Sequence, residues 1–168
     1  MISKKIQDAF NEQIKHELES AYLYLSMVAY FQSTGFDGMA HWMEMQTQEE
    51  LAHAQKFFNH IAERDGRVEL QTLAKPKLEW DSPLDAFQAA YKHEQFITSK
   101  INELTDLATK ENDHAAIIFL QWFVTEQVEE EATASKVVQD LKRIGDFGNG
   151  LIMIDRELGM RTAGTQEQ

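Results

Sequence analysis

Apolar residues recur every three or four positions along four long stretches of the chain, which is the spacing that places them on one face of an α-helix. Gly and Pro, which break helices, fall in groups at or beyond the ends of these stretches. The pattern predicts long helices over 4–33, 38–65, 83–111 and 114–144, followed by a short helix over 150–158. Asp37, Ser82 and Asp113 stand where helices begin, and their short polar side chains can cap free backbone amides there.

One long connection, residues 67–82, separates the second helix from the third. About 16 extended residues can reach about 50 Å, whereas a helix of about 27 residues is only about 40 Å long. The connection can therefore run the length of a bundle, which predicts two helical hairpins joined by a crossover rather than four helices joined by short turns. Its apolar residues favour packing over disorder. They are Val68, Leu70, Leu73, Leu78 and Trp80.

These elements predict an all-α fold: a four-helix bundle with a long crossover and a short fifth helix at the C-terminal end. The length of 168 residues fits one domain, residues 1–168. We expect residues 159–168 to form a flexible tail.

Polar side chains interrupt the apolar face of each long helix. They are Glu17 in the first, Glu50 with His53 one turn later in the second, Glu94 in the third, and Gln127 with Glu130 in the fourth. All lie near the midpoints of the predicted helices. If the helices pack side by side, these polar groups meet at one level of the core.

Four buried carboxylates at one level need compensation. An ionised carboxylate in an apolar interior costs several kcal/mol unless it is paired or binds a metal. No Lys or Arg falls at these positions, so bound cations are the simplest partners. The chain contains no Cys, which leaves carboxylate and imidazole as metal ligands and favours iron if the chemistry involves oxygen. Helical bundles are known to hold carboxylate-bridged dinuclear metal sites in this way.

A second group of acids, Glu49, Glu126 and Glu129, stands beside the first in the sequence. Runs of acids usually form a solvated helix face. Glu49 and Glu126 are each one residue, or about 100°, from a core position, so they can also border the site and hold a third cation. The spacing alone leaves both interpretations open.

Several aromatic and imidazole side chains are weaker candidates. Tyr24 lies two turns from Glu17 on the same face, so beside its packing role it is a candidate for a redox or hydrogen-bonding role. Trp122 is first of all a packing residue. Five histidines outside the polar level are expected at the surface or at helix ends. They are His16, His41, His60, His93 and His114.

Acidic residues outnumber basic ones by 28 to 16, for a formal net charge of -12. This balance argues against nucleic acid and anionic membranes as partners and favours cations. The N-terminus has no apolar signal core, and no run of about 18 uncharged apolar residues follows. The expected location is the cytoplasm.

These residues together resemble the bacterial non-haem ferritins, and the likeness extends from about Ile6 to Leu158. It rests on Glu17, Tyr24, Glu50-x-x-His53, the segment 91–95 around Glu94, Trp122, and Glu126-Gln127-x-x-Glu130. Bacterioferritins have a similar fold but carry Glu-x-x-His in the fourth helix and a haem-ligating Met after the glutamate of the second. Leu51 stands at that Met position here, so no haem is expected.

The resemblance implies a ferritin-like bundle that acts as a ferroxidase and an iron store. Two adjacent Fe(II) ions would pass electrons to O2 or H2O2, and Fe(III) would be kept as a mineral inside a shell of twenty-four identical subunits. The short C-terminal helix, apolar on nearly all sides, would pack about an axis of that assembly.

The resemblance also implies which residues hold the iron. The first iron would be held by Glu17, Glu50 and His53. The second would be held by Glu50, Glu94 and Glu130, with Gln127 close by. A third iron would be held by Glu49, Glu126, Glu129 and Glu130.

Two other functions fit the same residues. One is a di-iron oxidase or peroxidase that stores no iron. The other is a structural helical oligomer whose acids bind cations incidentally.

Overall fold

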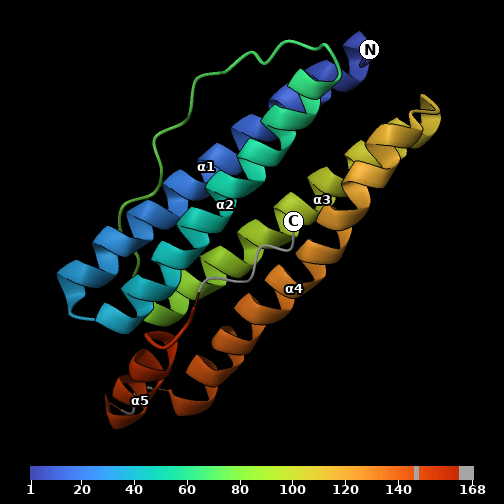
Figure 1. The fold of residues 1–168 in the computed structure, drawn as a ribbon. Helices are drawn as coiled ribbons and strands as arrows, with labels where there is room; N and C mark the ends of the chain where they lie inside the picture. The colour runs from blue at the N-terminus through green and yellow to red at the C-terminus, as the bar shows by residue number, and fades with distance from the viewer. Residues whose placement is uncertain (146–147, 163–168) are drawn as a thin grey trace.

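The computed structural model describes residues 1–145 and 148–162, which form five α-helices and no strand (Figure 1). The helices are α1 (Lys4–Thr34), α2 (Asp37–Glu63), α3 (Pro83–Lys110), α4 (His114–Ile144) and α5 (Gly148–Leu158). Each end lies within two residues of the position expected from the sequence. The predicted all-α fold, with four long helices and a short fifth, is confirmed.

The four long helices form two hairpins, α1 with α2 and α3 with α4, that pack side by side as a bundle. The short α5 lies at one end, beside the start of α2 and the end of α4 (Figure 1). The connection between α2 and α3 runs back along the outside of the α1 and α2 pair, from one end of the bundle to the other. The predicted crossover topology is therefore confirmed.

Side chains of α1 fasten the crossover to the bundle. Asn11 is buried, and its amide donates to the carbonyl oxygen of Arg67 at 3.1 Å and accepts from the amide of Glu69 at 2.9 Å. Further along, the hydroxyl of Ser26 donates to the carbonyl oxygen of Lys77 at 2.7 Å. These bonds replace the water that the extended backbone would otherwise need.

The apolar residues of the crossover pack only in part. Trp80 is buried against the bundle, and Val68 and Leu73 are half-buried. The prediction is wrong for Leu70 and Leu78, which are 69% and 51% exposed. An extended segment on a surface turns alternate side chains outward, so it cannot bury all of its apolar residues.

Two hydrophobic clusters fill the bundle, one on each side of the polar level. One contains Phe31, Met43, Ala90 and Val137 among its members. The other contains Ile14, Phe57, Ile97 and Phe123 among its members. In every long helix the polar residues noted above fall in the sequence between a member of one cluster and a member of the other. The sequence thus places a polar layer between two apolar ones.

Two of the three predicted helix caps are confirmed. The Ser82 hydroxyl accepts from the amide of Asp85 at the start of α3, and the Asp113 carboxylate accepts from the amide of Ala116 at the start of α4, both at 3.1 Å. Each side chain satisfies one of the amides that the first helical turn leaves without an internal partner.

The third cap was predicted wrongly. Asp37 is the first residue of α2, and the preceding Phe36 makes no side-chain bond to the helix. The carboxylate of Asp155 in α5 instead accepts from the amide of Met39 at 2.8 Å. An acid from the other end of the chain therefore caps α2 and holds α5 in place.

Gly38 permits this contact between α5 and α2. A Cβ at this position would lie 1.7 Å from the carbonyl oxygen of Asp155. Gly38→Ala is therefore expected to displace α5, break the cap on α2 and lower the free energy of unfolding by about 2 kcal/mol, which chemical denaturation measures. Gly148→Ala is the matched control, because a Cβ there meets no atom of the described residues within 4 Å. Equal stability of the two variants would contradict the packing described here.

None of the helices in the described part of the chain has a stretch both long and apolar enough to cross a bilayer. Residues 159–162 follow α5, and the Arg161 side chain contacts α2. The remaining residues of the predicted tail, 163–168, lie outside the described part.

Candidate metal centre

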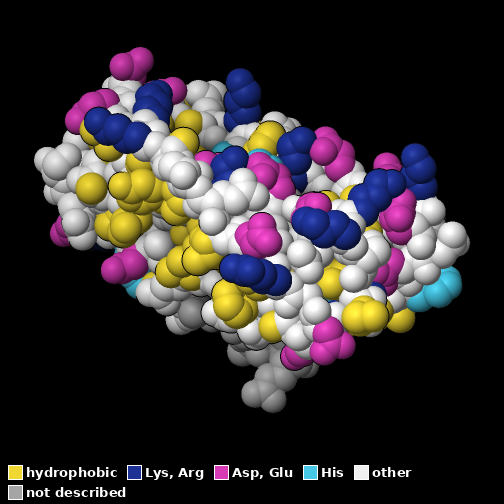
Figure 2. Space-filling model, turned by 90° about the horizontal axis from the view of Figure 1, so that it is seen from above, with side chains coloured by type: hydrophobic (Ala, Val, Ile, Leu, Met, Phe, Trp, Pro, Cys, Tyr) yellow, Lys and Arg dark blue, Asp and Glu magenta, His cyan; other side chains and the backbone are white. Residues whose placement is uncertain are grey.

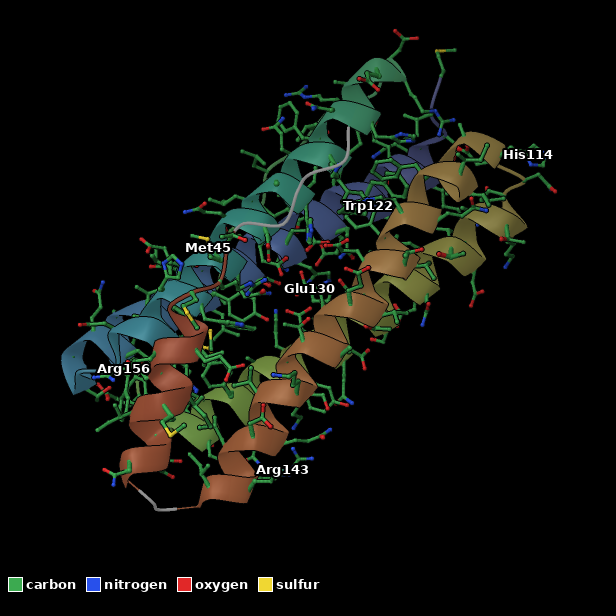
Figure 3. The ribbon with its side chains drawn as sticks, turned by 60° about the horizontal axis from the view of Figure 1, so that its bottom comes forward. Met45, His114, Trp122, Glu130, Arg143 and Arg156 are labelled. Carbon is green, nitrogen blue, oxygen red and sulfur yellow. The ribbon has the colours of Figure 1, made fainter. Side chains whose placement is uncertain are left out.

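The polar side chains expected at mid-bundle are all buried, each with 5% or less of its surface exposed. They are Glu17 from α1, Glu50 and His53 from α2, Glu94 from α3, and Gln127 and Glu130 from α4. Figure 3 shows Glu130 directed from the middle of α4 into the bundle, with Trp122 about two turns nearer the start of that helix. Helical periodicity thus brings polar residues from four distant segments to one level.

Glu17, Glu50 and His53 form the tightest group. Each offers a ligand atom, and the three atoms lie within 4.8 Å of one another. His53 Nδ1 is 3.4 Å from Glu50 Oε2. Glu17 Oε2 and Glu50 Oε2 are buried and have no hydrogen-bond partner among the described residues. Buried carboxylate oxygens directed at one point with an imidazole nitrogen are suited to a divalent cation.

A second group of candidate ligands links the buried centre to a half-buried residue at its edge, Glu126. His53, Glu126 and Glu130 also offer ligand atoms within 4.8 Å of one another. His53 Nε2 lies 3.9 Å from Glu126 Oε1, so the two ring nitrogens face different carboxylates. A neutral imidazole carries a proton on only one of its two nitrogens. The His53 ring can therefore donate either to Glu50 or to Glu126, depending on which nitrogen that is.

Glu94 is held from two sides rather than grouped with the other acids. The Tyr24 hydroxyl donates to Glu94 Oε1, and the Gln127 amide donates to Glu94 Oε2 at 3.2 Å. Tyr24 therefore makes a hydrogen bond to one of the candidate ligands, and its role at a metal site stays a prediction. Both donors fix the orientation of the carboxylate, as the partners of metal ligands usually do.

Two buried glutamines complete the polar layer and were missed in the sequence. Gln13 donates to Glu17 Oε1 at 2.8 Å, and Gln46 donates to Glu130 Oε2 at 2.8 Å. Gln13 stands four residues before Glu17, and Gln46 four residues before Glu50, so both share a helix face with an acid. That spacing is the signal that could have identified them.

Burial and mutual repulsion hold protons on the central carboxyls. Burial, and then the charges of Glu94, Glu17 and Glu130, raise the pKa of Glu50 well above its ordinary value. Burial raises the pKa of Glu94 to about 7, although hydrogen bonds from Tyr24 and Gln127 oppose the shift. Burial and the charge of Glu94 raise the pKa of Glu130 to about 8. A cation entering at neutral pH would therefore displace protons as it binds.

The acids that the sequence placed beside the central ligands also come together in space. Glu49, Glu126, Glu129 and Glu130 line one pocket of about 180 Å³, together with Thr133, Arg161 and Thr162. Glu49 and Glu126 are half-buried, whereas Glu129 is exposed. Burial, and then the neighbouring charges of Glu129 and Glu49, raise the pKa of Glu126 against the opposing effect of His53. Arg161 was not predicted here, because nothing in its spacing relates it to these acids.

The five remaining histidines lie outside this centre, but His93 is not at the surface as expected. Burial lowers the pKa of His93 to about 4, and its Nε2 lies 2.7 Å from the Ser20 hydroxyl. Its ring also packs edge-on against Tyr24, with centroids 6.1 Å apart. His93 therefore packs against the Tyr24 ring and helps to hold it in position.

The chain resembles known proteins over nearly its full length. The family model of the ferritin-like domain matches residues 7–144. A bacterial non-heme ferritin of Bacteroides fragilis is 44% identical and covers 96% of this chain and all of its own length. A bacterial non-heme ferritin of Staphylococcus aureus is 38% identical and covers 96% of this chain and 98% of its own.

Solved structures give the same result. A ferritin of the archaeon Archaeoglobus fulgidus, described as a novel open pore ferritin, superposes with a TM-score of 0.95 at 49% identity. It covers 96% of this chain and 100% of its own. A form of that ferritin engineered to be closed superposes with a TM-score of 0.96, also at 49% identity, over 98% of this chain and 100% of its own. The chain therefore belongs to the ferritin family, and its relatives include bacterial non-heme ferritins.

Proposed function

We propose that this protein oxidises Fe(II) at the buried carboxylate layer and stores the product as a ferric mineral inside a shell of twenty-four subunits. One observation carries the proposal: carboxylates from four helices are buried at mid-bundle, near enough for three of them to raise the pKa of Glu50, and two have oxygens without a hydrogen-bond partner in the described chain. Oxygen ligands with a single imidazole fit iron, and so does the family.

The first proposed ligand set follows the grouping of the ligand atoms, the third follows the acids that line the 180 Å³ pocket, and the second follows the likeness to bacterial non-heme ferritins. Glu17, Glu50 and His53 would bind one Fe(II) ion. Glu50, Glu94 and Glu130 would bind a second, with Gln127 close by. Glu49, Glu126, Glu129 and Glu130 would bind a third at the edge. Glu17, Glu94 and Glu130 are already oriented by neighbouring donors, so these three carboxylates need little reorganisation when iron enters the centre.

The reaction balances without any group beyond the iron and its oxidant. Two Fe(II) ions lose one electron each, and O2 takes up the two electrons with two protons to give H2O2. If H2O2 is the oxidant, two electrons and two protons convert it to two molecules of water. The protein positions the two ions, and its carboxyls release protons as the ions bind.

Exposed apolar side chains support assembly with further copies of the chain. Figure 2 shows apolar side chains gathered into patches between charged ones on one face of the molecule. Ile152 and Met153 on α5 are 52% and 72% exposed, and Leu70 on the crossover is 69% exposed. Apolar surface gathered in this way is typical of protein interfaces. The cytoplasmic location expected from the sequence stays a prediction.

Iron titration in air distinguishes storage from its alternatives. The storage proposal predicts a particle of about 470 kDa, twenty-four times 19.4 kDa, that takes up hundreds of iron ions or more and keeps the brown product in solution. Size-exclusion chromatography with light scattering measures the particle, and iron analysis of that fraction measures uptake. Saturation near two or three ions per chain would indicate an oxidase without storage. Absence of both oxidation and uptake would favour the structural oligomer.

A further inference from the structure

Arg161 lies beyond α5 and reaches back to the middle of α2. Its Nη2 donates to Glu49 Oε2 at 2.7 Å, and its Nη1 donates to the carbonyl oxygen of Trp42 at 3.4 Å. The guanidinium carbon stands 4.6 Å from the centre of the Trp42 ring. His41 Nε2 lies 2.8 Å from the carbonyl oxygen of Arg161 and holds the backbone there. Two hydrogen bonds, a cation–π contact and a backbone contact thus fix one C-terminal arginine.

The same guanidinium lines the acidic pocket. Arg161 is one of the residues around the 180 Å³ space that Glu49, Glu126, Glu129 and Glu130 also border. The side chains of Arg161 and Glu49 are only 19% and 17% exposed, so water screens their charges incompletely. A guanidinium is always charged in a protein, so this pocket contains a cation of its own at every physiological pH.

We propose that Arg161 is a built-in competitor of metal ions at this pocket. The guanidinium occupies Glu49 Oε2 at 2.7 Å and places a fixed positive charge beside the pocket, so both the occupied oxygen and the charge oppose a metal ion there. An ion that takes Glu49 Oε2 as a ligand must therefore displace Arg161 from Glu49 and Trp42, and an ion that binds Oε1 alone does so against the charge of the guanidinium. The inference rests on the proposed function to the extent that it assigns a metal ion to this pocket.

Competition of this kind has two consequences. Protons must leave the carboxyls at both sites, and at the edge pocket the metal must also overcome the ion pair with Arg161, so the edge pocket fills after the centre. The coupling is also reciprocal: the factor by which the pair between Arg161 and Glu49 weakens metal binding equals the factor by which the metal weakens the pair. A metal ion bound in the pocket therefore changes the surroundings of the Trp42 ring, which the guanidinium contacts.

Calorimetric titration of the metal-free, assembled protein with Zn²⁺, which is not oxidised, tests the proposal. Wild type is expected to show a tight class of sites at the centre and a weaker class at the edge. Arg161→Ala should tighten the weaker class about tenfold and leave the tight class unchanged, since one charge-assisted hydrogen bond in a partly exposed pair no longer has to be broken. Arg156→Ala is the matched control, because it removes the same charge from an exposed position on α5. Its binding should equal that of wild type.

Tryptophan emission provides an independent readout. Zn²⁺ added over the range of the weaker class should change the emission of wild type as Arg161 leaves the Trp42 ring. This change should disappear in both Arg161→Ala and Trp42→Phe, and it should persist in Arg156→Ala. Glu49→Gln should show the altered emission before any metal is added, because the ion pair is already broken.

The outcomes separate this proposal from the proposed function. If the tight class is present and the weaker class has the same or lower affinity in Arg161→Ala, then competition by Arg161 is refuted while the central site stands. If none of the proteins binds Zn²⁺ tightly, the metal centre itself is refuted and competition with it.

Discussion

Replacing Glu50 and Glu94 together with alanine is expected to slow Fe(II) oxidation in air by roughly 100-fold or more. Loss of a residue that only supports a metal ligand commonly reduces metal affinity or activity 10- to 100-fold, so loss of two proposed ligands should reach at least the upper value. Glu50 would contribute to both central irons, and Glu94 completes the second ligand set. Stopped-flow absorbance of the ferric product measures the initial rate at two Fe(II) ions per chain.

The matched control for this variant is Glu44→Ala with Glu103→Ala. These two glutamates lie on the same helices, α2 and α3, but are exposed, so the control makes the same two substitutions on those helices without touching the core. It should oxidise iron at the wild-type rate. Both variants should keep the wild-type helix content and particle size, because alanine favours helices and, in the core variant, removes carboxyl groups whose burial is costly. Oxidation at the wild-type rate in Glu50→Ala with Glu94→Ala would place the reaction elsewhere.

The periodicity of the sequence was sufficient to predict the polar layer. A helix face is fixed by spacing, and the height along a bundle is fixed by distance from the helix ends, so Glu17, Glu50 and Glu94 could be placed at one level without a structure. The absence of cysteine then limited the ligands to oxygen and imidazole nitrogen. Both steps use local properties of single helices.

Contacts between distant segments could not be predicted in the same way. Gln46 bonds to Glu130 across 84 residues, Arg161 to Glu49 across 112, and Asp155 to the amide of Met39 across 116. Periodicity gives the face and the height of a side chain but not its partner on another helix. Arg161 illustrates the limit, because it follows the last helix, where no periodic pattern exists.

Hydrogen bonding within the site was also beyond the sequence. Tyr24 was a candidate because it shares a face with Glu17, yet its hydroxyl donates to Glu94 of another helix. His93 was expected at the surface because it lies one residue away from a core position. It is half-buried, because the space between α1 and α3 accommodates its ring beside Tyr24 and Ser20.

The metal-free protein is expected to melt roughly 5 °C lower at pH 8.5 than at pH 6.5. The pKa of Glu94 is about 7 and that of Glu130 about 8 in the folded state, whereas ordinary glutamates titrate near 4.5. Between pH 6.5 and 8.5 the folded state therefore holds protons that the unfolded state has already lost. Stability from these protons is complete below about pH 4.5 and is lost as the pH rises through 7 and 8.

The compared pH range must begin at 6.5, because below that pH His93 makes stability rise with pH, opposite to the effect of the carboxyls. Its pKa is lowered to about 4, so its folded state binds fewer protons than the unfolded state between pH 4 and 6.5, and stability there rises with pH. Differential scanning calorimetry of the metal-free protein at several pH values measures the whole profile. Above pH 6.5 only the raised carboxyls should govern the slope at the centre.

Glu94→Gln with Glu130→Gln supplies the control for this slope. The two amides keep the size and polarity of the side chains but hold no titratable proton, so the fall in melting temperature from pH 6.5 to 8.5 should become much smaller. Zn²⁺ should reverse the slope in the wild type, because metal binding releases protons and grows stronger as the pH rises. A wild-type profile as flat as that of the double variant would mean that these carboxyls are already ionised at pH 6.5. Some cation other than the metal would then have to neutralise them in the core.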